Sequence, residues 1–128
     1  MPPFWTIGTL AGASSIMLGA FGAHGLRARL SGSDTTRLAN WNMAAQYQLV
    51  HSAVLMFTAV VAPRNRLAMG LFTGGMGLFC GSIYLLALDA QRFKVLGPVT
   101  PVGGLCLIGG WVALAARGRP VFKFAKMR

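Results

Sequence analysis

The sequence has very few acidic residues and few charges of either sign. Asp34 and Asp89 are its only acids, against twelve Lys and Arg, and charged residues make up 11% of the 128 positions. Because an ordinary soluble domain carries about a quarter, this composition argues against a soluble globular protein. Two cysteines are too few for a disulfide scaffold, and a hydrophobic content of 55% excludes disorder. A small, single-domain integral membrane protein remains.

Four long windows contain no Lys, Arg, Asp or Glu: 1–26, 38–63, 67–88 and 95–116. A membrane-spanning helix needs about 20 residues, and a backbone in lipid must satisfy its own hydrogen bonds. Apolar runs such as 53–62 do not alternate as the strands of a membrane β-barrel would. The sequence therefore predicts an all-α integral membrane four-helix bundle over residues 1–116, with spans near 5–26, 40–62, 67–88 and 96–116, and a basic tail over 117–128.

The first window is interpreted as a retained helix rather than a signal peptide. It lacks a basic start, and its apolar stretch is too long. The segment Gly22-Ala-His24-Gly25 is interpreted as the stop of this helix. A functional alternative for the same segment is binding of a lipid headgroup or a quinone-like polar head.

The basic residues fall between and after the windows. An even number of spans places both termini on one side, with seven cations against five on the other, which favours the cytoplasmic or matrix side for the termini. Cations at helix ends do not form a nucleic-acid-binding face, so we expect no nucleic acid partner. The tail is either solvated or lies on anionic lipid. The candidate headgroup contacts are Arg27, Arg29, Arg117, Arg119, Lys123 and Lys126.

Two windows carry small residues at the same spacing. Small residues allow close contact between helix backbones in lipid, so both stripes are expected to mediate packing within the bundle. Replacing Gly74 or Gly77 by Leu is then expected to disrupt the fold. Chance alignment among 17 glycines is the alternative. The stripes comprise Gly8, Gly12, Ser15 and Gly19 in the first window, and Gly70, Gly74, Gly77 and Gly81 in the third.

The second window has a stripe at heptad spacing formed by Trp41, Ala44, Gln48 and His51. Polar side chains facing lipid are costly, so this stripe is expected to face the bundle interior. His51 in particular should be buried and hydrogen-bonded across helices. The sequence predicts an intramembrane polar cluster of His24, Gln48, His51, Tyr84 and Thr100.

These residues carry a family resemblance that covers roughly residues 8 to 112. In order, the segments resemble the small inner-membrane family that includes transmembrane protein 256, also called domain of unknown function 423. Cys80 stands where the family pattern has serine. The resemblance implies a multi-helix protein of bacterial inner membranes or mitochondria, and it implies no established reaction. The segments that carry it are 19–26, Trp41, Ala44, 47–48, His51, 77–84, 100–104 and 110–111.

Little in the sequence points to catalysis. His24, His51, Cys80 and Cys106 show no metal-ligand spacing, and no nucleophile stands beside a base. We expect no enzyme activity, cofactor or metal.

The favoured hypothesis is a structural or accessory subunit of a larger complex in an energy-transducing (respiratory) inner membrane. The mitochondrial membrane is preferred over the bacterial one, and the expected partners are other membrane subunits and anionic lipids. A small transporter or channel for an uncharged solute is the alternative, and a membrane enzyme is a third possibility.

Overall fold

The computed structural model describes residues 3–30, 32 and 34–117. Within these residues the chain forms four helical segments that are long and apolar enough to cross a membrane, and the prediction of an all-α membrane bundle is confirmed. The elements in order are α1 (Pro3–Phe21), the π-helical segment η1 (Gly22–Leu26), α2 (Arg27–Arg29), α3 (Thr35–Val61), α4 (Arg66–Leu88), the short 3₁₀ turn η2 (Lys94–Leu96) and α5 (Val99–Arg117).

The helices extend somewhat beyond the charge-free windows. The first segment runs without a break from α1 through η1 into α2, and α3 begins at Thr35 rather than near residue 40. At 1.5 Å per residue, the 27 residues of α3 span about 40 Å, against about 30 Å of hydrocarbon. Because α3 is longer than the hydrocarbon layer is thick, a charged residue in its first turn such as Arg37 can remain helical and still reach the headgroup region.

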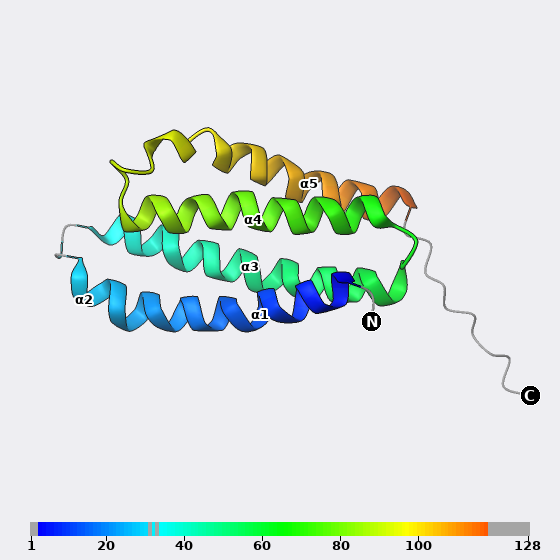
Figure 1. The fold of residues 1–128 in the computed structure, drawn as a ribbon, viewed down its shortest axis with the longest axis horizontal. Coiled ribbons are helices and arrows are strands. Elements are labelled where there is room, and N and C mark those ends of the chain that lie inside the picture. Colours follow the sequence, from blue (N-terminus) through cyan, green and yellow to red (C-terminus); the bar gives the residue numbers. More distant parts are fainter. Residues whose placement is uncertain (1–2, 31, 33, 118–128) are drawn as a thin grey trace, which may run out of the picture.

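The helices lie side by side and run nearly parallel to one long axis (Figure 1). The middle helix α3 packs against both α1 and α4, and α5 packs against α4. The start of α1, the 62–65 loop and the end of α5 lie at one end of the bundle, and α2, the start of α3 and the 89–98 connection lie at the other. This arrangement puts the cations of the described residues at the two ends of the bundle.

The glycines at the end of the first span do not stop the helix as expected. The segment from Gly22 to Leu26 continues as a π-helix, whose turn is wider than that of an α-helix. The indole N–H of Trp41 on α3 donates to the Leu18 carbonyl just before this segment, at 2.7 Å. A Cβ on residue 22 would lie 2.7 Å from the indole nitrogen of Trp41. Gly22 therefore allows the indole to approach the backbone.

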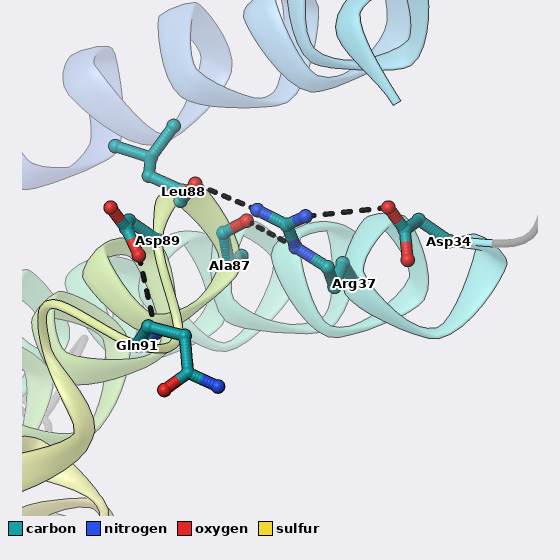
Figure 2. A network of polar contacts seen from close by, with 6 residues as sticks. All are labelled: Asp34, Arg37, Ala87, Leu88, Asp89 and Gln91. Atoms are coloured by element: carbon teal, nitrogen blue, oxygen red, sulfur yellow. Dashed lines mark hydrogen bonds and ion pairs between the residues drawn. The ribbon is translucent and has the colours of Figure 1, made fainter. Parts of the chain in front are cut away.

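The C-terminal end of α4 is capped by a side chain from α3 (Figure 2). Arg37 donates from Nε to the Ala87 carbonyl at 2.8 Å and from Nη2 to the Leu88 carbonyl at 2.7 Å. Its Nη1 lies 3.4 Å from Asp34 Oδ2. Asp89 Oδ1 then accepts the backbone N–H of Gln91 at 3.1 Å, which turns the chain after α4. Both acids of the chain are thus used at this end.

The two glycine stripes play different roles. A Cβ at Gly8 or Gly12 would lie 3.1 Å from Ser52 atoms, so these glycines do set a close contact between α1 and α3, while Gly19 has only the Ala45 methyl at 4.0 Å. The prediction that the α4 stripe packs against another helix of the bundle is wrong. A Cβ there would meet nothing within 4 Å, because the stripe faces away from the other described helices. The four α4 glycines concerned are Gly70, Gly74, Gly77 and Gly81.

Other glycines bring α4 and α5 together. A Cβ on Gly103 would lie 2.7 Å from Phe79 Cα, and one on Gly75 would lie 2.9 Å from the Leu107 backbone nitrogen. The tightest helix contact in the fold therefore uses glycines outside the repeated spacing. The repeat by itself does not identify the packing face.

Candidate functional site

Gln48 is the centre of a hydrogen-bonded network that joins three helices. From α3, its side-chain amide donates to the Ala11 carbonyl at 2.9 Å and to Ser14 Oγ at 2.8 Å on α1. Its carbonyl oxygen accepts the Tyr84 hydroxyl of α4 at 2.9 Å. The Tyr84 ring packs on Trp41, with ring centroids 4.7 Å apart. The amide thus uses both N–H donors and its carbonyl oxygen, which fixes the relative rotation of α1, α3 and α4.

His51 joins α3 to α5 and lies outside the Gln48 network. Its Nδ1 lies 2.7 Å from the Tyr47 carbonyl, and its Nε2 lies 3.2 Å from the indole nitrogen of Trp111. A carbonyl only accepts and an indole N–H only donates. The imidazole is therefore the neutral tautomer that carries its proton on Nδ1, and both ring nitrogens are occupied. In this state His51 is a structural residue without a free nitrogen for a ligand.

Two further polar bonds tie α5 to the bundle. The hydroxyls of Ser82 on α4 and Thr100 on α5 lie 2.6 Å apart. At the opposite end, Asn65 donates to the Ala113 carbonyl at 2.9 Å and accepts the Ala68 N–H at 3.2 Å. Within the part of the chain that the structure describes, every buried side-chain nitrogen or oxygen has a hydrogen-bond partner. The interior is thus closed and internally satisfied.

The five residues expected to form one cluster occupy separate places. Gln48 and Tyr84 bond to each other, whereas His51 pairs with Trp111 and Thr100 pairs with Ser82. His24 is exposed on η1. A single cluster is therefore wrong, because helix rotation sends side chains at similar depth to different neighbours.

A groove of about 560 Å³ opens on the outer surface between α3 and α5, above Phe79 of α4. Its lining combines the rings of Tyr47 and His51 on one side and Trp111 on the other with the aliphatic side chains of Val50, Leu107 and Ile108. Tyr47 lies 5.1 Å from Phe79 and 5.8 Å from His51 between ring centroids. Gln46, exposed on α3, adds a primary amide to the wall. The groove thus combines flat rings with two neutral hydrogen-bonding groups.

The remaining candidate residues lie at the ends or outside the described part. Arg27 and Arg29 are exposed on α2, and Arg117 is exposed at the end of α5. Arg119, Lys123 and Lys126 lie outside the described residues. Cys80 is buried, Cys106 is partly buried, and the described ranges contain no group of three potential metal ligands from His, Cys, Asp and Glu.

Several residues of these sites are missing from the sequence prediction. Trp111 and Ser14 make interhelical bonds from within spans, and Asn65 makes one from the loop between α3 and α4. Asn65 carries a recognisable local signal, since an Asn two residues after Pro63 and shortly before the apolar run that starts at Leu67 suits a helix N-cap. Gln46 could also have been singled out from the sequence, because a primary amide within a membrane span is rare.

The chain matches a family model and several curated relatives. Residues 18–104 match the model described as "Protein of unknown function (DUF423)". A UPF0382 membrane protein of Schizosaccharomyces pombe is 36% identical over 115 residues, which cover 86% of this chain and 96% of that protein. One of Staphylococcus aureus is 35% identical over 129 residues, covering 98% and 99%, and one of Staphylococcus haemolyticus is 36% identical over 118 residues, covering 89% and 93%. No solved structure matches significantly.

Proposed function

Because the chain belongs to the DUF423 (UPF0382) family of small membrane proteins, a family of unknown function, we propose its role from its surfaces: it is a non-catalytic accessory subunit that packs inside a larger membrane complex. The main support for this role is the outward-facing glycine stripe of α4, formed by Gly70, Gly74, Gly77 and Gly81. In lipid, small residues bring helices together through close backbone contact. Because this stripe contacts no other described helix of the bundle, its surface is suited to close packing against a helix from another subunit.

The closed interior supports this role over that of a channel or transporter. A path for an uncharged solute needs room and polar groups that can exchange partners. At the level of Gln48, that side chain, Ser14 and Tyr84 fill the space between α1, α3 and α4 and bond one another. The observed network favours a rigid packing unit.

The proposal also covers the membrane in which the complex lies and the lipids it contacts. The complex belongs to an energy-transducing inner membrane, which is the mitochondrial inner membrane or, in bacteria, the cytoplasmic membrane. Cations at both ends of the bundle, including Arg27, Arg29 and Arg117, suit contact with anionic headgroups. The basic tail from residue 118 onward extends this charge and serves as a second anchor to a subunit or lipid.

Native gels of mildly solubilised host membranes test the proposal. The full-length protein should migrate with a large complex. Gly74→Leu and Gly77→Leu should shift it to the free form while the bundle stays folded, and deletion of residues 118–128 should loosen the association. Ala13→Leu is the matched control, since Ala13 is exposed on α1 away from the stripe. Purification of the parent only as a free monomer, or unchanged migration of both glycine variants, contradicts the proposal.

A further inference from the structure

The groove between α3 and α5 holds two polar groups at a depth where lipid offers no hydrogen-bond partner. Gln46 is about 16 Å along α3 from Thr35. If the helix is centred on the hydrocarbon, the amide lies about 11 Å below the boundary. Within the described part of the chain, the Gln46 amide and the Tyr47 hydroxyl make no hydrogen bond, although both residues line the groove. Unpaired polar groups in hydrocarbon are costly.

The rest of the groove defines what can cover these groups. Tyr47, Phe79 and Trp111 provide flat aromatic walls, and Gly104 leaves the α5 side open. Its volume of about 560 Å³ is in the range of small-molecule sites. Charged side chains are absent from its lining among the described residues. His51, whose two nitrogens are already bonded, adds a rigid wall.

We infer that this groove binds a neutral, flat ring carrying carbonyl or hydroxyl oxygens and an apolar tail, the chemistry of a lipid-soluble quinone. The ring would stack among the aromatic walls and its oxygens would accept from Gln46 and Tyr47. A phospholipid fits less well, because its acyl chains have no acceptor and its ester carbonyls stay near the hydrocarbon boundary. A fatty acid would require a cation that the groove lacks.

This site is independent of the surface proposed for assembly. At 100° per residue, Phe79 lies about 200° around α4 from both Gly77 and Gly81. The groove and the glycine stripe therefore occupy opposite faces of α4. A failure of ligand binding leaves the accessory role untouched, and a failure of assembly leaves the groove untouched.

Fluorescence titration of the full-length protein in phosphatidylcholine nanodiscs tests the inference. Decylubiquinone and a short-tailed menaquinone are the probes, and the signal is the quenching of tryptophan fluorescence, to which Trp111 at the groove wall contributes. Trp5→Phe, which leaves the groove lining intact, removes part of the background fluorescence. At least one probe should give a saturable component. An excess of decylbenzene, which has the tail and a ring but no ring oxygens, should not relieve it.

Variants then assign the binding to the polar groups. Gln46→Leu and Tyr47→Phe should each weaken binding about tenfold, as expected for loss of one hydrogen bond in a dry site. Asn42→Leu is the matched control, one turn away on the exposed face of α3 and outside the groove, and should stay within about twofold. Gly104→Leu should abolish binding by filling the groove.

Three results would overturn the inference: no saturable quenching by either probe, relief of quenching by decylbenzene, or unchanged binding in both Gln46→Leu and Tyr47→Phe. Circular dichroism and thermal unfolding of each variant confirm that the bundle is intact. Since Gln46 and Tyr47 are exposed, neither substitution creates a cavity in the core.

Discussion

Trp111 of α5 donates its indole N–H to Nε2 of His51 on α3 at 3.2 Å, across a separation of 60 residues in sequence. The two rings also meet edge to face, with centroids 6.2 Å apart. Because α5 otherwise packs mainly on α4, this pair is what draws α5 toward α3. It also closes the inner wall of the groove.

The Trp111→Phe variant removes the donor and keeps an aromatic ring. We expect it to lower the free energy of unfolding by about 0.5–1.5 kcal/mol, the range for an interhelical hydrogen bond in a membrane protein. Reversible unfolding in mixed micelles measures this loss. Trp5→Phe is the control, because Trp5 makes no hydrogen bond among the described residues, and an equal loss in both variants would contradict the role of the pair.

The Gln48→Leu variant should destabilise the bundle. It leaves the Tyr84 hydroxyl buried without its acceptor and removes two bonds to α1, so we expect a loss of about 1–3 kcal/mol. The measurement is unfolding of the purified protein in micelles. Gln46→Leu makes the same chemical change two residues away on the exposed surface and should cost little. Similar stability of the two variants would argue against the Gln48 network.

A single methyl group at Gly103 should destabilise the bundle more than a whole leucine at Gly74. The Cβ of Gly103→Ala would press on the Phe79 backbone, which cannot move aside cheaply, whereas Gly74 faces open space. We expect a loss of about 1–3 kcal/mol for Gly103→Ala and a near-parental melting temperature for the isolated Gly74→Leu protein. The reverse order of stability would show that the α4 stripe packs within the bundle.

The Arg37→Gln variant should loosen the end of α4. It removes the guanidinium bonds to the Ala87 and Leu88 carbonyls, which are orphan acceptors at a helix end. Because Arg37 is partly exposed, we expect a loss of about 1 kcal/mol. Faster amide hydrogen exchange in residues 85–92 would report it. Arg29→Gln, an exposed change at the same end of the bundle, should leave that exchange unaltered.

The number of spans could be predicted from local sequence alone, but their exact ends could not, since α3 begins at Thr35 rather than near residue 40. Hydrocarbon thickness sets the length of an apolar helix, and the cost of charge in lipid moves Arg and Asp to the ends. Both effects act on each span separately, so the windows 38–63 and 67–88 correspond closely to α3 and α4. The interior place of Gln48 was predicted from the cost of a polar group in lipid, yet Gln46 in the same span is exposed, so this cost alone does not decide which polar side chains are buried.

Tertiary structure alone decided the rotation of each helix about its axis. Lipid is as apolar as the protein core, so an apolar face carries no signal of inside or outside. Gly8 and Gly12 therefore contact α3 while Gly74 and Gly77, at the same spacing, face outward. The pairing of His51 with Trp111 and of Thr100 with Ser82 also depends on these rotations. The sequence determined by itself how the chain crosses the membrane, and contacts between distant helices decided which side chains meet.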